Sequence, residues 1–589
     1  MVKKIISYLM SAVLLFSIGC AKNSDIDDLQ DQLQNLENRL SQSEAALQAN
    51  LLSQIGDLQA VIATLQNAID ANDAAQAAAL AAQMAELEAL QQLVENSAND
   101  IYYGNVISPE QFDAVLAQGA TVITGDVVLT AAMLDKLVNV KLIGGDIEIN
   151  DDVTLDALEV VVGTMTTNGV VMANKLMSIG DLEFNANFEA PELTAVTGDI
   201  YSFRQMEVEK FMAPKLGFAN SIFIQGESVY GLNGNTLVIS DFKVADGISV
   251  VENLELVNVK SGSDLVIGEV SGMFRFENGR AAKITYTAET VGDFKVSGVT
   301  NIVSIEAPEL TTANSINVSS NFENFRDPVN EHGLYTMSFD KVETVNSYVK
   351  IAGNNNLQEF DTFNALTTIK AENLPSNTWA LEINDGGPNS AKFNGFNELT
   401  DIEDSAYSGK IEVRIKSGNI TAFSKITHVN NFDQLHITSA DNVSIFENLE
   451  TVSYELKMDF TGVAGTVNSL TKFKHFTGWR STLIICMPYS QDDMAAHFAT
   501  NADVYTPFCD MINSLDHTLA SDMSSVTSKY TYLQNGTTQK TNGGTFQLLK
   551  RTSNVAPYVR HYDGGWKYDE TQSDEFWTEA ITGISSACQ

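Results

Sequence analysis

Apolar residues recur at steps of three and three through the middle of the chain, from residue 121 to residue 487. Neighbouring triplets begin 17 to 56 residues apart, and the short spacings define a repeating unit of 20 to 24 residues. We interpret the long spacings as skipped or degenerate units. The triplets include Leu134/Leu137/Val140, Leu155/Leu158/Val161, Ala190/Leu193/Val196, Val251/Leu254/Val257, Ala307/Leu310/Ala313, Phe339/Val342/Val345, Phe363/Leu366/Ile369, Phe396/Leu399/Ile402, Phe423/Ile426/Val429 and Phe446/Leu449/Val452.

A Gly-Asp pair and a short alternating segment follow many of these triplets, as in residues 125–129, 145–149, 180–184 and 292–296. Alternation of apolar and polar residues is typical of a strand with one buried face, and glycine allows a turn conformation that other residues avoid. One such unit cannot bury its apolar face alone, whereas stacked units cover one another. The pattern predicts a mainly β fold in which residues 121–487 form a solenoid of parallel strands.

A β-sandwich is the alternative architecture, but steps of three and three do not fit the period of two in its strands. The unit Leu-x-x-Val-x-Gly-Asp-Ile resembles the receptor L-domain, a leucine-rich-repeat-like β-helix of growth-factor receptors and of fungal and bacterial surface proteins. The resemblance covers residues 121 to about 480 and rests on the repeat pattern. Many units lack the asparagine found at the turn of standard leucine-rich repeats, so the resemblance leaves the shape of the coil open.

Residues 24–95 have the composition and apolar spacing of a long helix. They contain no proline and one glycine, and apolar residues step by three and four, as at Ile26, Leu29, Leu33 and Leu36. A lone helix would leave this seam in water, so we expect a coiled coil with another copy of the chain, as a parallel dimer or a trimer. A solitary alanine-rich helix that acts as a spacer is the alternative. Residues 20–97 are thus predicted to form a stalk.

The first 19 residues have the parts of a secretion signal: two lysines, an apolar run over residues 5–18, and Gly19 before Cys20. Residues 17–20 resemble the end of a bacterial lipoprotein signal, although Ser17 stands where that family usually has leucine. The tract after Cys20 resembles the lysine-plus-acid tracts of Bacteroidota surface lipoproteins. These resemblances imply that Cys20 is acylated and holds the chain in the outer membrane, at the cell surface or on the periplasmic face. A plain secretory signal with an incidental cysteine is the alternative.

Residues 98–120 are predicted to be a joint and a capping helix. Ser108 can cap the helix, Pro109 suits its first turn, Gln111 completes a capping box, and Gly119 ends it. A short amphipathic helix at this point commonly covers the first exposed coil of a solenoid.

Three cysteines remain after Cys20. Cys486 and Cys509 are 23 residues apart, about one unit, so a continuing coil would place them within disulfide reach on adjacent rungs. A bond between Cys509 and Cys588, or three reduced buried thiols, are the alternatives.

Residues 488–589 are predicted to form a C-terminal cap and a small β module. Turn signals at residues 535–536, 542–544 and 563–565 separate short aromatic-rich runs, which indicates hairpins. The aromatic residues either stack on sugar rings or form the core of the module. Those that would form a stacking platform are Tyr558, Tyr562, Trp566 and Tyr568.

Charge and motifs narrow the function. The chain has 75 acidic and 35 basic residues, a net charge of −40, which disfavours nucleic acid as a partner. We find no enzyme motif and expect no cofactor, and the seven histidines lack metal-ligand spacing. The order of lipid, stalk, solenoid and cap leads to the hypothesis of a non-enzymatic cell-surface protein that mediates adhesion or binds a protein or glycan ligand. A structural envelope protein and a β-helix carbohydrate-active enzyme are the alternatives.

Overall fold

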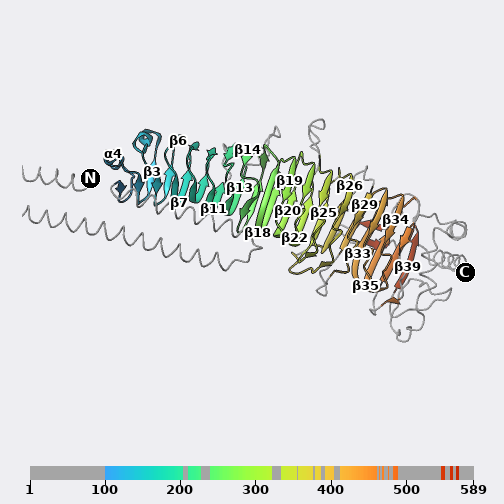
Figure 1. The fold of residues 1–589 in the computed structure, drawn as a ribbon. Coiled ribbons are helices and arrows are strands. Elements are labelled where there is room, and N and C mark those ends of the chain that lie inside the picture. Colours follow the sequence, from blue (N-terminus) through green and yellow to red (C-terminus); the bar gives the residue numbers. More distant parts are fainter. Residues whose placement is uncertain are drawn as a thin grey trace, which may run out of the picture. The chain divides into compact units, whose positions relative to one another are not determined.

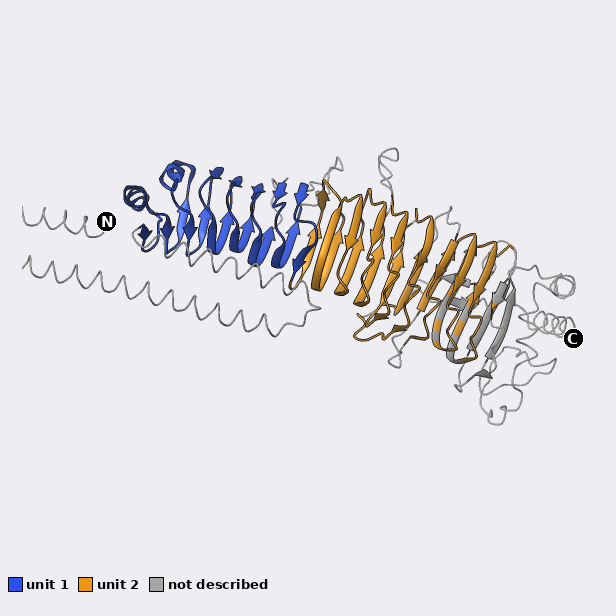
Figure 2. Cartoon of the chain, in the orientation of Figure 1, with its two compact units in different colours: residues 1–250 blue, residues 251–589 orange. Residues whose placement is uncertain are grey.

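The computed structural model describes most of residues 100–460 and short strands beyond them. The chain divides into two compact units, residues 1–250 and residues 251–589 (Figure 2). The predicted signal peptide, Cys20 and the predicted coiled coil lie outside the described residues. In full, the described residues are 100–202, 210–226, 239–321, 333–354, 356–375, 378–385, 392–402, 411–460, 463–464, 467–469, 475–476, 482–487, 545–550, 558–560 and 566–568.

The described part of the first unit begins with β1 (Ile101–Tyr102), and the predicted capping helix, α4 (Pro109–Gln118), follows it. The backbone N–H of Ser108 donates to Gln111 Oε1 at 2.9 Å, and Gly119 ends the helix with a φ of +66°. Phe112 and Val115 are buried beneath α4. The helix predicted from the capping box is therefore confirmed.

Parallel strands form most of the described remainder of the first unit, and the main-sheet strands lie beside the matching strands of the preceding coil (Figure 1). One sheet has the order β1-β2-β4-β7-β9-β11-β13-β15, and β3 and β5 precede β7 along its other part. A second sheet has the order β6-β8-β10-β12-β14. The parallel pairing confirms stacked coils and rules out the β-sandwich for this unit. The strands are β1 (Ile101–Tyr102), β2 (Val122–Ile123), β3 (Val127–Leu129), β4 (Leu142–Ile143), β5 (Ile147–Ile149), β6 (Val153–Leu155), β7 (Val160–Thr167), β8 (Val171–Ala173), β9 (Ser178–Phe184), β10 (Phe188–Glu189), β11 (Ala195–Ser202), β12 (Lys210–Met212), β13 (Phe218–Gln225), β14 (Ile239–Lys243) and β15 (Ile248–Val250).

The Gly-Asp pairs connect successive coils of the first unit. Asp126 Oδ1 accepts a hydrogen bond from the backbone N–H of Asp146 at 3.0 Å, and Asp146 Oδ1 accepts from the backbone N–H of Thr164 at 2.8 Å. A Cβ on Gly145 would lie 2.3 Å from Asp126 Oδ1. The expected reason for the glycine was wrong, because Gly145 does not have a positive φ. Only glycine fits here, because the side chain of Asp126 in the preceding coil occupies the place that a Cβ would take.

The second unit repeats this construction with longer strands. Its main sheet has the order β16-β18-β20-β22-β25-β28-β31-β33-β35-β38-β39. The series β18-β19-β21-β23 and β22-β24-β27-β30 branch from it. A separate sheet has the order β26-β29-β32-β34-β36, and β40 and β41 form an antiparallel hairpin.

The strands of the second unit are β16 (Leu254–Val257), β17 (Val259–Ser261), β18 (Leu265–Glu277), β19 (Lys283–Tyr286), β20 (Thr290–Ser297), β21 (Ser304–Glu306), β22 (Thr312–Ser319), β23 (Thr336–Ser338), β24 (Thr344–Val345), β25 (Val349–Ala352), β26 (Glu359–Thr362), β27 (Thr368–Ile369), β28 (Leu381–Asp385), β29 (Lys392–Gly395), β30 (Asp401–Ile402), β31 (Ile411–Lys416), β32 (Asn419–Ala422), β33 (His428–Ser439), β34 (Asn442–Ile445), β35 (Thr451–Asp459), β36 (Val467–Ser469), β37 (His475–Phe476), β38 (Thr482–Met487), β39 (Thr545–Lys550), β40 (Tyr558–Arg560) and β41 (Trp566–Tyr568).

A column of stacked phenylalanines fills one corner of the second unit. The rings of Phe363 and Phe396 lie 5.1 Å apart at 9°, and those of Phe423 and Phe446 lie 5.3 Å apart at 16°. All four residues have φ between +53° and +59°, a conformation that non-glycine residues rarely adopt. All four side chains are buried, so packing in the column holds this backbone in place.

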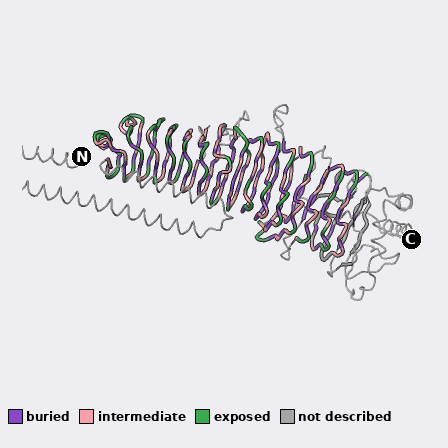
Figure 3. Tube along the Cα trace, viewed as in Figure 1, coloured by how far each residue is buried: buried purple, intermediate pink, exposed green. Residues whose placement is uncertain are grey.

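The burial pattern confirms most of the predicted triplets (Figure 3). Two predictions need correction. Val251 is 46% exposed, and Val250 and Leu254 are buried on either side of it, so the first position of that triplet is wrong. The 32-residue spacing between Ala307 and Phe339 is one coil, because β21 pairs directly with β23. Extra residues within one coil, as well as skipped units, therefore lengthen the spacing.

Charged side chains also link neighbouring coils on the outer face of the second unit. Arg275 on β18 contacts Glu255 at 3.0 Å and Glu277 at 2.7 Å, and Lys295 on β20 contacts Glu277 at 2.9 Å. Partial burial raises the pKa of the Glu277 carboxyl, but hydrogen bonds from Lys295 and Arg275 outweigh burial, so the pKa lies below its usual value. Glu277 therefore stabilises the folded state in its charged form.

We expect Glu277→Gln to lower the thermal unfolding midpoint near neutral pH and to lose this effect in acid. The stability from Glu277 is present above the pKa of the unfolded chain, about 4.3, and is lost as the pH falls through the lower folded-state pKa. Thermal unfolding of both proteins between about pH 7 and about pH 3 tests this. Exposed Glu372→Gln is the control, and an effect of Glu277→Gln that does not change with pH would contradict the assignment.

Gly180→Ala should destabilise the first unit, whereas Gly217→Ala should not. A Cβ on Gly180 would lie 2.3 Å from the Val162 carbonyl oxygen, while the nearest atom to a Cβ on Gly217 is 3.9 Å away. Overpacking of this kind costs about 1–3 kcal/mol. The urea unfolding midpoint of the two variants provides the measurement, and equal midpoints would refute the close approach.

Candidate ligand-binding site

The sequence-predicted site residues near the C-terminus are only partly within the described residues. Tyr558 and Tyr568 are direct partners across the β40–β41 hairpin, and Trp566 pairs with Arg560. The predicted hairpin around residues 563–565 is thus confirmed. Tyr562 lies outside the described residues, so a shared aromatic platform stays a prediction.

The predicted disulfide also stays a prediction. Cys486 lies in β38, where its register partners are Asp459 in β35 and Leu549 in β39. Residues 545–550 therefore form the strand that follows β38 in the sheet, in place of the segment around residue 509. Cys509 and Cys588 both lie outside the described residues.

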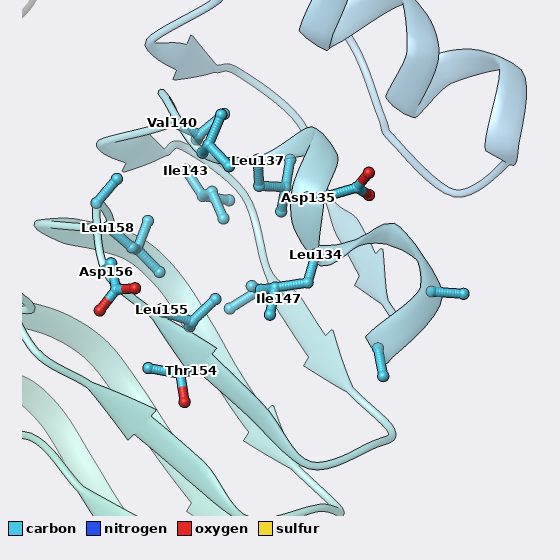
Figure 4. A pocket seen from close by; sticks show the side chains of 14 residues that line it. Leu134, Asp135, Leu137, Val140, Ile143, Ile147, Thr154, Leu155, Asp156 and Leu158 are labelled. Carbon is cyan, nitrogen blue, oxygen red and sulfur yellow. The ribbon is translucent and has the colours of Figure 1, made fainter.

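A cavity lies in the first unit, between the 3-10 helix η1 (Ala131–Lys136) and β6 (Figure 4). Its volume is about 610 Å³, within the range of small-ligand sites. Leu134, Ile147 and Leu155 point into the same space, with Leu137 and Leu158 beside them. Val138, which is 57% exposed, also lines the cavity, so apolar surface is open to solvent here.

The cavity exists because the coil of β2 and β3 carries η1 where later coils carry a strand of the second sheet. Met133 N–H donates to the carbonyl oxygen of Thr130 at 2.9 Å, and this turn directs residues 131–136 into a 3-10 helix. The backbone N–H of Ala131 donates to Asp151 Oδ2 at 3.0 Å, which ties the start of η1 to the next coil. A helix does not pair with a strand, so a gap remains beside β6.

As a result, β6 is the end strand of its sheet on the side of η1. The backbone N–H of Val153 donates to Val170 at 2.8 Å, and the carbonyl of Leu155 accepts from Asn174 at 3.1 Å. Backbone groups of successive strand residues point to opposite edges, so those of Thr154 point away from β8 and toward η1. Among the described residues, no backbone hydrogen bond reaches Thr154 from that side.

The surroundings of the cavity are acidic. Residues 131–160 contain seven acidic and two basic residues. Both bases have acidic partners: Lys136 lies 3.1 Å from Asp113, and Lys141 lies 3.1 Å from Glu159. The hydrogen bond to Asp113 raises the pKa of Lys136. Asp135 and Asp156 line the cavity itself. The site therefore suits a ligand that combines apolar groups with positive charge.

The described residues hold no grouping of histidine, cysteine and acidic side chains suited to a metal ion. Among the titratable side chains, partial desolvation lowers the pKa of the exposed His428, whose Nδ1 lies 2.6 Å from Thr451 Oγ1. This pair joins β33 to β35.

Sequence reasoning missed the cavity. Leu134/Leu137/Val140 was treated like every other triplet, but Leu134 is only half-buried. The signal lay in the preceding residues, where Ala131-Ala132-Met133 replaces the apolar and polar alternation of later coils. Alanine and methionine favour helix over strand.

No helix within the described residues is long and apolar enough to span a membrane. Comparison with known families gives one match: the Receptor L domain family matches residues 313–411. That segment runs from β22 to the first residue of β31 in the second unit. Comparisons with curated proteins and with solved structures gave no match. Over residues 313–411 the chain is therefore similar to the Receptor L domain.

Proposed function

We propose that this protein is a lipid-anchored bacterial surface protein whose solenoid binds a protein or glycan ligand. The observation that carries the proposal is the match of residues 313–411 to the Receptor L domain, a family whose description names a receptor. The described strands of the matched segment pair in parallel from one coil to the next. Stacked coils present repeated outward side chains, which is how solenoid proteins commonly form extended binding surfaces.

The N-terminal sequence supports an anchor. An apolar run ends at Gly19-Cys20, and residues 24–95 have the spacing of a coiled coil. A stalk of about 70 residues at about 1.5 Å per residue would extend about 100 Å. A binding solenoid on such a stalk would stand well clear of the lipid surface in the outer membrane, and we expect it to face outward from the cell.

Charge supports a choice among ligand classes. With a net charge of −40, the chain repels phosphate backbones, so protein and glycan are the favoured classes. Many charges on the outer face of the second unit are held in ion pairs, such as Lys350 with Glu382 at 2.8 Å. A ligand there would meet a polar surface on which acidic residues are in excess.

Cys20→Ser should abolish lipid attachment and release the protein from membranes. Fractionation of cells and mass spectrometry of the N-terminal peptide measure both effects, with Ser17→Leu, which restores the usual lipoprotein signal, as the control. Protease added to intact cells should then remove the solenoid of the unsubstituted protein. A membrane-bound Cys20→Ser protein would contradict the anchor, and a protease-resistant solenoid on intact cells would contradict the outward orientation.

The released Cys20→Ser protein should bind at least one glycan or protein saturably on arrays of glycans and envelope or host proteins. Heat-unfolded protein is the control, since binding by the solenoid requires folded coils. The bound ligand should be recovered unchanged by mass spectrometry, whereas cleavage would indicate a carbohydrate-active enzyme. Absence of binding, together with weakened envelopes in a deletion strain, would favour a structural role instead.

A further inference from the structure

We propose that the groove between η1 and β6 binds an extended basic peptide segment of a partner protein, which adds a strand to the free edge of β6. This inference is independent of the lipid anchor and of the family match. It depends on three features of the first unit: an open strand edge, an apolar cavity beside that edge, and an excess of acidic residues around both.

The open edge supplies backbone recognition. The backbone groups of Val153 and Leu155 form hydrogen bonds on the side of β8. The N–H and C=O of Thr154, between them, point toward η1. Thr154 is exposed. The backbone of an extended peptide can accept a hydrogen bond from the Thr154 N–H and donate one to the Thr154 C=O. Peptide recognition by strand addition derives its affinity from such main-chain hydrogen bonds.

The cavity supplies side-chain recognition. Its apolar lining from Leu134, Ile147 and Leu155 lies beside the edge, and its volume of about 610 Å³ can hold apolar side chains of a bound strand. Successive residues of a strand point to opposite sides, so only every second side chain of the peptide can enter. The ligand should therefore alternate apolar and polar residues.

Charge identifies the polar residues and the partner. Seven acidic and two basic residues lie within residues 131–160, and Lys136 and Lys141 are held by Asp113 and Glu159. Basic residues in the peptide are thus favoured. The preceding segment of this chain does not fit, since residues 20–99 contain twelve acidic and two basic residues. A second copy is disfavoured for the same reason, because the whole chain is strongly acidic.

The test uses the mature Cys20→Ser chain and a labelled Lys-Val-Lys-Val-Lys-Val-Lys peptide in fluorescence anisotropy. We expect saturable binding that weakens about tenfold or more when the lysines are replaced by glutamates. A peptide of the same composition with all lysines before all valines should also bind at least about tenfold more weakly, since it cannot place alternate valines in the cavity. Equal binding of the two lysine peptides would reduce the interaction to charge attraction and overturn the proposal, as would no binding at all.

Thr154→Pro and Thr154→Ala separate the backbone from the side chain. Proline removes the N–H that faces the groove and is tolerated on strand edges, so binding should fall about tenfold while Thr154→Ala binds like the unsubstituted chain. Circular dichroism confirms that the variants fold. If Thr154→Pro does not fold, a peptide with its central valine replaced by proline tests the same hydrogen bonds on the unsubstituted chain. Undiminished binding in the folded proline variant, or by the proline peptide, would refute strand addition.

Discussion

Backbone hydrogen bonds between successive coils determine where the strands of each unit lie. Parallel pairing sets each residue beside its equivalent one coil later, as for Phe274 and Phe294 or Leu182 and Ile200. Inward positions therefore align with inward positions, and apolar side chains form continuous columns. The phenylalanine column and the chain of Gly-Asp contacts both follow from this register, because each needs the same residue at the same place in neighbouring coils.

The same constraint explains why the first unit has an apolar groove at its beginning. Every inner strand has a partner on each side, whereas the coil of β1 has no earlier coil beside it among the described residues. Helix α4 covers one part of that coil by burying Phe112 and Val115. Beside β6 the cover is the short helix η1, which leaves Thr154 with an open edge and Leu134 half-buried. A solenoid must end somewhere, and an end that is incompletely covered can be used for binding.

The stacked architecture could be predicted from the sequence because the apolar triplets and the Gly-Asp pairs both recur along it. The role or burial of a single residue could not be predicted where the same residue type fits two different environments. Gly145 was predicted to adopt a special turn, but it provides space for Asp126, which only the neighbouring coil reveals. Val251 fits the triplet spacing yet is exposed, because spacing does not distinguish adjacent valines. The groove was missed because it forms where η1 replaces a strand beside β6, and the apolar repeat does not show which coil lacks a strand.

Hydrogen exchange followed by mass spectrometry on the mature chain tests the stacked coils most directly. We expect slow exchange throughout β7, β9 and β11 in the first unit and β18, β20 and β22 in the second, because their amides donate to neighbouring coils. Protection should be strongest in these inner strands and weakest in the two-residue β1, which has one strand partner within the part of the chain that the structure describes. Exchange in the inner strands at the rate of an unfolded chain would contradict the account.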